Sequence, residues 1–299
     1  MTDAPADRPT TPAARPHRVG RDWPFYLGLG ILGGAYVVLL LAMLVADMRY
    51  VTGSDLVDAL RKPAIRASIR LSLISCTLTA LFSLWVAIPI GYILSRWNDT
   101  AFAEALRGRV LSVNQWRAVS KLVRNAIDAI LDIPIVLPPL VVGLSLLILF
   151  QFPPFSGVAD LVVYQVPAVI LAQFMVACAF AVGTMRATFD QIDPRREQVA
   201  LSLGCTRAQA FSRITLPEAH RGIITAATLA WARALGEFGP LLIFAGATRH
   251  KTEVLSTTVF LELSIGDLEA AVAVSLIMIA SAVVVLIITR LWGSKQFSI

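Results

Sequence analysis

The stretch REQVALSLGCTRAQAFSRITLP, residues 196–217, lies between two long apolar runs, 161–183 and 223–246. Each run is long enough to cross a membrane, because a helix needs about 20 apolar residues to span the hydrocarbon core. The stretch between them carries three arginines and many other polar residues. A polar segment of this length between two spans predicts a loop that meets a partner in the aqueous phase.

The composition of the whole chain is that of an integral membrane protein. Its 299 residues are 57% hydrophobic and only 15% charged, with a mean hydropathy of +0.71. Soluble globular domains are about 25% charged. We therefore expect an all-α integral membrane protein.

Six apolar stretches predict six transmembrane helices. They are residues 23–46, 65–94, 130–152, 161–183, 223–246 and 270–291. The first is too long for a signal peptide and has no clear cleavage site, so we expect it to remain in the protein. The second exceeds the length of a span, which predicts a tilt, a kink at Pro89 or a projection beyond the bilayer. Residues 1–22 contain four prolines and are expected to form a disordered tail.

Two adjacent prolines interrupt the third stretch. Pro138 and Pro139 have no backbone N–H group, so helical hydrogen bonds are lost here and lipid cannot replace them. A bend at this point should therefore face protein or a water-filled path. A helix that simply begins near Pro139 explains the pair equally well. The sequence leaves both interpretations open.

The distribution of lysine and arginine predicts the orientation in the membrane. The N-terminal tail carries four, each of the segments 95–129 and 184–222 carries six, and the C-terminal end carries two, whereas the alternate connections carry five in all. Both termini, including residues 294–299, and the 184–222 loop are therefore expected in the cytoplasm. This asymmetry accounts for the net charge of +6, and we expect no nucleic-acid partner.

Local signals predict a helix in the first half of the 196–217 stretch. Asp193 is a suitable N-cap and Pro194 suits the first helical position. The helix should end at Gly204, a residue type that adopts the left-handed conformation of a C-terminal cap.

A second short helix is predicted after the glycine. Thr206 and Gln209 have the spacing of a capping box, and Leu216-Pro217 is expected to stop this helix before the next span. Such a rigid helix–turn–helix would transmit a push from a soluble partner to the spans. The alternative is a solvated hairpin at the membrane surface without a partner.

The stretch resembles the EAA loop of permease subunits of bacterial ABC importers. Gln198 and Val199 stand where that family usually has Glu-Ala. The resemblance implies a coupling helix that docks into a groove on an ATPase subunit. It assigns this coupling role to Glu197, Gln198, Ala200, Gly204, Ile214, Leu216 and Pro217.

Other segments resemble the molybdate, tungstate and sulfate branch of these permeases. They are IVLPPLVVGLSLL at 135–147, ARALGEFGPLLIFAG at 232–246 and GDLEAAVAVSL at 266–276. The resemblance covers about residues 65–290 and favours molybdate or tungstate over sulfate. The 96–128 loop resembles an insertion, and its apolar spacing predicts one or two surface helices.

The resemblance also implies the partners and the mechanism. It implies ATP-binding cassette ATPase subunits, an extracytoplasmic solute-binding protein and a second permease, either an identical copy or a paired relative, in the cell inner membrane. ATP would be bound by the ATPase, and this chain would hold no cofactor. Alternating access would move the solute inward. The alternatives are an ABC permease for phosphate, iron or a polyamine, and a secondary transporter without an ATPase.

Two charges within the fifth apolar stretch mark a candidate translocation path or gate. Arg233 and Glu237 are four residues apart and so share one helix face. A charge at the bilayer centre costs about 3 kcal/mol on insertion scales, so the pair should face the bundle interior or a path. Gly239 would permit close helix approach at a gate. A self-neutralising structural pair is the competing interpretation.

The sequence contains no pattern for catalysis or metal binding. It has no Gly-rich phosphate loop ending in Lys-Ser or Lys-Thr, and GLGILGG at 28–34 lies within an apolar run without a preceding strand, which excludes a dinucleotide fingerprint. The three cysteines have no metal-ligand spacing. We therefore expect a transport subunit and no enzyme. Lys251, Asp267 and Glu269 are either contacts for the solute-binding protein or solvated loop charges.

Overall fold

The structure is a computed structural model that describes residues 23–97 and 113–294, and every regular element in these ranges is a helix. The chain divides into two compact units, residues 1–49 and 50–299, which are described separately. The described residues of the first unit all belong to helix α1 (Trp23–Tyr50). Its 28 residues extend about 42 Å at 1.5 Å per residue, which is long enough to span a bilayer.

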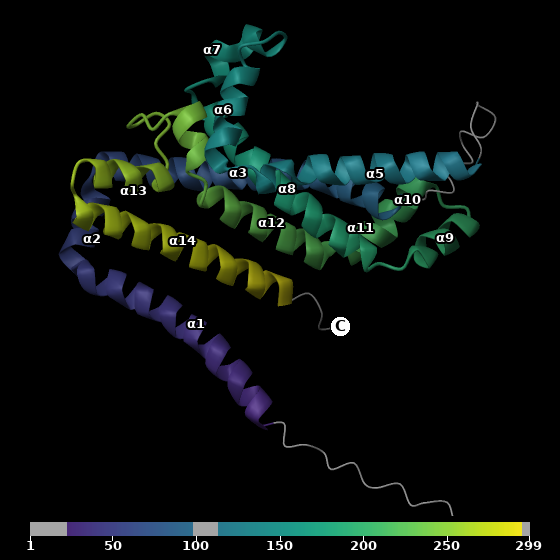
Figure 1. Cartoon of the computed structure of the whole chain (residues 1–299), viewed down its shortest axis with the longest axis horizontal. Coiled ribbons are helices and arrows are strands. Elements are labelled where there is room, and N and C mark those ends of the chain that lie inside the picture. Colours follow the sequence, from purple (N-terminus) through teal and green to yellow (C-terminus); the bar gives the residue numbers. More distant parts are fainter. Residues whose placement is uncertain (1–22, 98–112, 295–299) are drawn as a thin grey trace, which may run out of the picture. The chain divides into compact units, whose positions relative to one another are not determined.

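Three helices form the centre of the second unit (Figure 1). Helices α3 (Pro63–Ser95) and α8 (Val166–Asp190) pack along much of their lengths, and α12 (His220–Leu235) packs against both. Helix α14 (Leu268–Ser294) packs on α12 and on α13 (Leu255–Ser264).

Small side chains allow these helices to approach closely. Alanines of α8 and α12 are buried together in one hydrophobic core. Small residues are typical of helix contacts in membranes, where packing rather than the hydrophobic effect drives association. One face of α3 buries a row of hydroxyl side chains: Ser68, Ser72, Ser75, Thr79 and Ser83.

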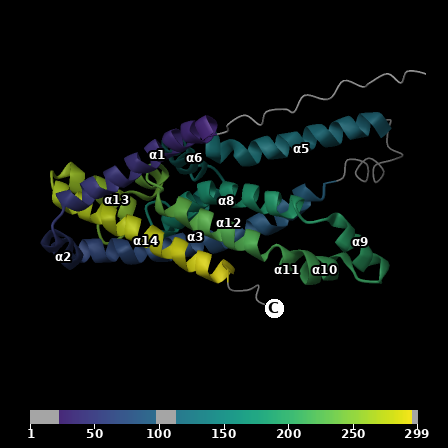
Figure 2. The ribbon, with the colours of Figure 1, turned by 90° about the horizontal axis from the view of Figure 1, so that it is seen from below.

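The second unit has two distinct ends (Figures 1 and 2). The short helices α9 (Pro194–Ser202), α10 (Arg207–Ala210) and α11 (Leu216–Glu218) lie at one end, which also holds the C-terminal end of α3. Helix α2 (Gly53–Arg61) lies at the opposite end, near α13. The basic 184–222 loop therefore belongs to one end of the bundle.

The double proline produces a sharp break. Helix α5 (Val113–Val136) is followed by α6 (Pro139–Leu149), and the two helices are bent by 110°. The sequence left a bend and a helix start as alternatives, and the structure combines them because α6 both begins at Pro139 and turns away from α5. A 3₁₀ turn, η1 (Phe155–Val158), and α7 (Ala159–Val162) connect α6 to α8.

A second break interrupts the fifth apolar stretch. Helix α12 ends at Leu235, and a π-helical turn, η3 (Leu241–Ala245), follows Pro240. The two breaks are packed together through glycines. A Cβ atom on Gly143 would lie 2.8 Å from the Cα of Pro240, and one on Gly239 would lie 2.9 Å from the Cβ of Pro139. The first break therefore faces protein, as expected for backbone without regular hydrogen bonds in a membrane.

The count of six spans remains a prediction. The described residues contain four helices that are long and apolar enough to cross a membrane, or five if α5 and α6 form one bent span. Pro89 lies within the continuous helix α3. Of the 96–128 loop, residues 113–128 belong to α5, while 98–112 lie outside the described residues, as do the predicted tail and residues 295–299.

Candidate functional site

The first half of the 196–217 stretch has the predicted helix and caps. The carboxylate of Asp193 accepts a hydrogen bond from the backbone N–H of Arg195 at 2.9 Å, which caps α9. Gly204 has a φ of +88° directly after the last turn. The backbone N–H of Cys205 reaches back to the carbonyl of Ala200 at 3.0 Å, so the helix end is satisfied by its own chain.

The second half also begins as predicted and ends one residue after the expected stop. Thr206 and Gln209 form the capping box of α10. A π-helical turn, η2 (Phe211–Thr215), and α11 then continue the helical backbone through Pro217. The helical backbone ends at Glu218, one residue after the expected stop at Leu216-Pro217, and α12 begins at His220. Pro217 lies in the first turn of α11, where a missing N–H group costs little.

The nine residues of α9 have an inward and an outward face. Glu197 and Ala200 are 9% and 5% exposed and face the bundle. Gln198 is exposed, Val199 is 59% exposed and Leu203, at the helix end, is 80% exposed. In the sequence, Val199 stood out only as a departure from the family pattern and Leu203 did not stand out. Their exposure on an otherwise polar surface loop is the signal of a docking face, and it required the structure.

The remaining predicted coupling residues lie beside α9 in the chain but differ in exposure. Gly204 and Pro217 are exposed, while Ile214 and Leu216 are half-buried. The hydroxyl of Thr215, in η2, donates to the carboxylate of Glu197, in α9, at 2.9 Å and so joins the two elements. The loop is thus one packed element.

The Glu197 carboxylate is held by hydrogen bonds from its own chain. Tyr92 Oη donates to Oε2 at 2.9 Å, and Arg96 Nε and Thr215 Oγ1 donate to Oε1 at 3.0 and 2.9 Å. Burial by itself raises the pKa of this carboxyl. The hydrogen bonds from Arg96, Tyr92 and Thr215 outweigh that effect, so the pKa lies below its ordinary value of 4.5 and the group is ionised at neutral pH.

The predicted charge pair of the fifth stretch is formed. Arg233 Nη2 and Glu237 Oε1 lie 2.6 Å apart, and the side chain of Glu237 is 1% exposed while that of Arg233 is 30% exposed. The guanidinium of Arg233 also lies over the ring of Phe180, with 5.7 Å to the centroid. Glu237 stands in the break after α12, two residues before Gly239. A partly exposed arginine at a helix break is suited to contact a path, and its buried partner fixes its position.

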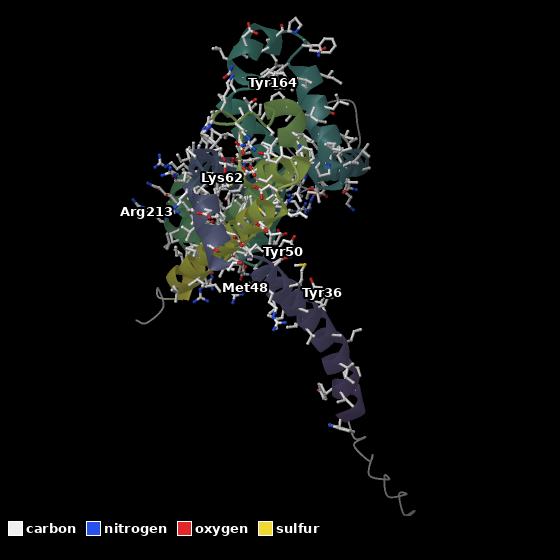
Figure 3. The ribbon with its side chains drawn as sticks, turned by 90° about the vertical axis from the view of Figure 1, so that its left-hand side faces the viewer. Tyr36, Met48, Tyr50, Lys62, Tyr164 and Arg213 are labelled. Atoms are coloured by element: carbon white, nitrogen blue, oxygen red, sulfur yellow. The ribbon has the colours of Figure 1, made fainter. Side chains whose placement is uncertain are left out.

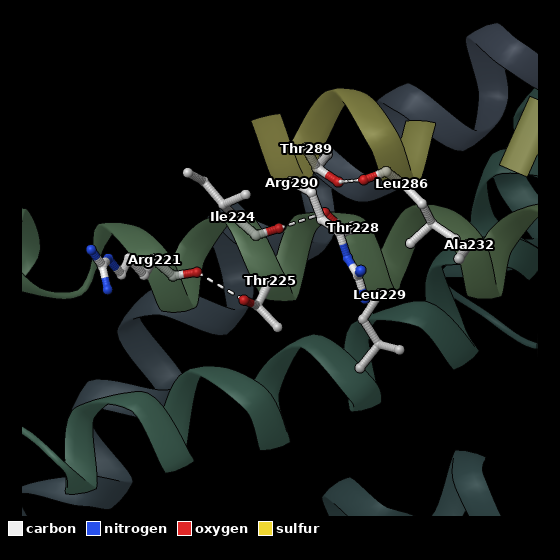
Figure 4. Close-up of a pocket in the computed structure, with 9 residues that line it drawn as sticks. All are labelled: Arg221, Ile224, Thr225, Thr228, Leu229, Ala232, Leu286, Thr289 and Arg290. Carbon is white, nitrogen blue, oxygen red and sulfur yellow. Dashed lines mark hydrogen bonds between the residues drawn. The ribbon is translucent and has the colours of Figure 1, made fainter. Parts of the chain in front are cut away.

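A groove of about 680 Å³ runs along α12 and α14 (Figure 4). Arg221 and Arg290 both line it, together with Thr225 and Thr228. The two threonine hydroxyls donate to carbonyls of their own helix at 2.9 and 2.8 Å. The groove is therefore lined by two arginines among apolar and threonine side chains, and the Arg221 side chain points away from that of Arg290 (Figure 4).

A separate ion cluster lies at the α2 end of the second unit. Glu262, only 1% exposed, accepts from Lys62 at 3.3 Å and from Arg249 at 2.9 Å (Lys62 is labelled in Figure 3). Lys62 also donates to Asp267 at 2.8 Å, which raises the pKa of Lys62 and lowers that of Asp267. Asp267, a candidate contact for a binding protein, is thus paired within the chain, whereas Lys251 and Glu269 are exposed.

Comparison with known proteins identifies the family. Residues 108–296 match the profile of the family described as binding-protein-dependent transport system inner membrane component. The chain belongs to this family. It is a transport subunit and no enzyme, as the sequence predicted. The match includes α9 to α14 and both helix breaks.

Curated relatives extend the match over most of the chain. The sulfate transport system permease protein CysT of Salmonella typhimurium is 28% identical over 92% of this chain and 93% of its own length. The molybdate/tungstate transport system permease protein WtpB of Thermococcus kodakarensis is 31% identical over 75% of this chain and 79% of its own. The similarity to CysT, over 280 residues, is longer than the 65–290 stretch that the sequence analysis delimited.

The fold also matches a solved transporter structure. A crystal structure of a bacterial alginate ABC transporter in complex with alginate pentasaccharide-bound periplasmic protein contains a chain that superposes with a TM-score of 0.69. That chain is 19% identical, and the match covers 94% of this chain and 97% of that one. The all-helical fold is therefore that of an ABC transporter permease.

Proposed function

We propose that this permease moves an oxyanion into the cytoplasm by alternating access, with ATP hydrolysed by a separate ATPase subunit. Molybdate or tungstate is the favoured solute and sulfate is the next candidate. Support comes from the family match and from relatives named as sulfate and as molybdate/tungstate permeases. Membership of this family does not support a secondary transporter that works without an ATPase.

The outward face of α9 carries the proposal for ATPase coupling. Leu203 and Val199 expose apolar surface on a loop that is otherwise polar. The same end of the bundle holds the basic 184–222 segment, which favours a cytoplasmic location. A rigid, capped helix with an exposed apolar tip fits a groove on a soluble partner. We therefore assign docking to Val199, Leu203 and Gln198.

The inward residues of the coupling loop have a different role in this proposal. Glu197 and Ala200 hold α9 against the bundle, and Gly204 provides the left-handed turn after it. Ile214, Leu216 and Pro217 continue the loop directly toward α12. Movement of the docked helix would thus pass through the turn at Gly204 and through α10, η2 and α11 to α12, and α12 carries Arg233.

A second permease copy, or a paired relative, would complete the path. Arg233 is partly exposed on α12, and Arg221 and Arg290 line a separate groove along α12 and α14. Arginine is suited to a tetrahedral oxyanion because its fork of donors matches the oxygens. A second copy would enclose the path together with α12, and a solute-binding protein would deliver the oxyanion from the opposite side of the membrane.

The solute is tested by reconstitution. The permease is purified with its ATPase and its solute-binding protein, and ATP-dependent uptake of molybdate, tungstate, sulfate, phosphate, iron and a polyamine is measured in proteoliposomes. We expect uptake of molybdate or tungstate at the lowest concentration. Uptake of phosphate, iron or a polyamine, with no oxyanion of the molybdate type, would overturn the assignment of solute.

The docking face is tested by Leu203→Asp with Leu203→Met as the matched control. The aspartate places a charge in the proposed apolar contact, whereas the methionine keeps a similar volume and polarity. We expect the ATPase to co-purify with Leu203→Met and to be lost from Leu203→Asp, although both variants reach the membrane. Equal recovery of the ATPase with both variants would contradict docking at this face.

A further inference from the structure

The glutamate of the coupling loop is directed into the permease itself. Glu197 is 9% exposed, and both of its carboxylate oxygens accept hydrogen bonds from the same chain. The donors lie far away in sequence, on the last turns of α3 and in η2. A carboxylate held in this way is not free to contact an ATPase. Its partners therefore have to be considered as part of the coupling apparatus.

Arg96 is the centre of this arrangement. It follows the last residue of α3, and its guanidinium reaches three separate segments. Nε donates to Glu197 at 3.0 Å, and Nη2 lies 2.9 Å from the same oxygen. Nη1 donates to the carbonyl of Phe189 at 3.0 Å, and Nη2 to that of Ile192 at 3.1 Å. The two carbonyls belong to the end of α8 and the residues just after it.

Aromatic packing surrounds the same point. The ring of Tyr92, whose hydroxyl donates to Glu197, lies edge-on to Phe189, with centroids 5.7 Å apart. It also lies against Phe211 of η2, with centroids 4.6 Å apart. The charged contact is thus enclosed by side chains from α3, α8 and η2. A partly desolvated, charge-assisted contact is stronger than an exposed one.

We propose that Arg96 is a positioning residue that fastens the coupling helix to the ends of α3 and α8, so that a displacement of α9 moves both spans. This inference rests on the proposed function, because it concerns how the same loop transmits motion. Arg96, Glu197, Tyr92 and Thr215 form the clasp. In the sequence, Arg96 is only one of the six basic residues of segment 95–129 that indicate topology.

The geometry requires an arginine and not simply a positive charge. A planar guanidinium can donate in several directions at once, and here it serves one carboxylate and two carbonyls. Lysine keeps the charge but has a single ammonium group, which cannot occupy both the Nε and the Nη positions. Arg96→Lys should therefore preserve attraction to Glu197 while releasing α9 from the end of α8.

The test compares Arg96→Lys with Arg186→Lys in the complex of full-length permease, ATPase and binding protein. Arg186 forms a partly buried pair with Asp128, at 2.5 Å, which joins α8 to α5 and does not involve α9. The measured quantity is solute transported per ATP hydrolysed in proteoliposomes. Loss of charge-assisted bonds should lower this ratio by about tenfold or more in Arg96→Lys. Arg186→Lys should retain the wild-type ratio.

A second variant and a second measurement keep the test decisive. Tyr92→Phe removes one hydroxyl from the clasp and hardly changes the volume, so it should assemble and show a smaller fall in the same ratio. Backbone amide exchange in residues 194–203, measured on the full-length permease alone, should accelerate in Arg96→Lys and remain at the wild-type rate in Arg186→Lys. This readout does not require the ATPase.

The outcomes separate the clasp from the proposed function. A wild-type transport ratio in Arg96→Lys, or in Tyr92→Phe if Arg96→Lys fails to assemble, would overturn the positioning role. Unchanged amide exchange of α9 in Arg96→Lys would show that the clasp does not hold the helix. If the wild-type complex itself neither hydrolyses ATP nor transports solute, the proposed function fails, and the exchange measurement alone decides whether the clasp exists.

Discussion

Substitution of Gly239 by alanine should separate the two helix breaks that the structure packs together. The added Cβ would lie 2.9 Å from the Cβ of Pro139, 3.0 Å from the backbone nitrogen of Leu140 and 3.1 Å from the carbonyl carbon of Pro139. Ordinary carbon–carbon contacts are about 3.5–4.0 Å, so the segments must move apart by about half an ångström or more. Two of the three atoms are backbone, and no side-chain rotation relieves the contact.

The magnitude follows from this overlap. Overpacking of a well-packed site costs about 1–3 kcal/mol. Gly239 is the first helical residue after the break that follows α12, so alanine gains less helix propensity there than in a helix interior. Gly143→Ala has the same clash from the other side, with the new Cβ 2.8 Å from the Cα of Pro240, but it lies within α6, where alanine recovers up to about 1 kcal/mol. Gly143→Ala should therefore be the milder of the two.

The assay is thermal unfolding of the purified permease, and the measured quantity is the apparent midpoint temperature. At about 2–4 °C for each kcal/mol, Gly239→Ala should lower the midpoint by several degrees. The matched control is Gly183→Ala in α8, where a Cβ would meet nothing within 4 Å and alanine should be neutral or stabilising. The double variant at 143 and 239 should cost less than the sum, because both methyl groups push apart the same contact.

One result would refute this reasoning. If Gly239→Ala and Gly183→Ala have the same midpoint, the breaks are not packed as described. A loss of transport in Gly239→Ala without any loss of stability would instead show that the close approach is needed for movement and not for folding.

Three further outcomes are expected. Gly204→Ala should weaken the end of α9 by about 1–2 kcal/mol, because φ is +88°, and amide exchange after residue 200 should accelerate while the global midpoint changes little. Lowering the pH should loosen α9, because the pKa of Glu197 is depressed in the folded state. The stability that the ionised carboxylate contributes is complete above the ordinary pKa of 4.5 and is lost as the pH falls through the lower folded-state pKa. Amide exchange of α9, measured from about pH 6 to about pH 3, would follow this loss. Glu262→Gln should lower the free energy of unfolding by about 1–2 kcal/mol, because it removes the buried charge shared by Lys62 and Arg249 while both cations are nearly half exposed. The thermal midpoint should fall accordingly, and a midpoint equal to wild type would show that the ion cluster adds nothing to stability.

Features that depend on a few neighbouring residues were predictable from the sequence. The cap at Asp193, the left-handed turn at Gly204 and the capping box from Thr206 to Gln209 all follow from local backbone requirements, and the structure contains each of them. The interruption at Pro138-Pro139 was predictable for the same reason, although its direction was not. Membrane composition likewise predicted the all-helical fold.

Features that depend on distant contacts were not predictable. Arg96 and Glu197 are 101 residues apart, and only the packing of α3 beside α8 brings them together. The π-helical turn η2 between α10 and α11 was not predicted either. The interpretation of α9 was incomplete for a related reason: the motif indicates which residue types occur, whereas the bundle decides which of them face outward.

On the proposed function, two different molecules constrain α9 and its C-cap residue Leu203. Glu197 and Ala200 have to fit the body of this permease, while Val199 and Leu203 have to fit whatever surface receives the helix. The outward residues could therefore be replaced by those of a permease that works with a different ATPase. We expect this chimera to bind that ATPase and to keep its own fold. The outward residues of this helix would then determine which ATPase subunit the permease binds.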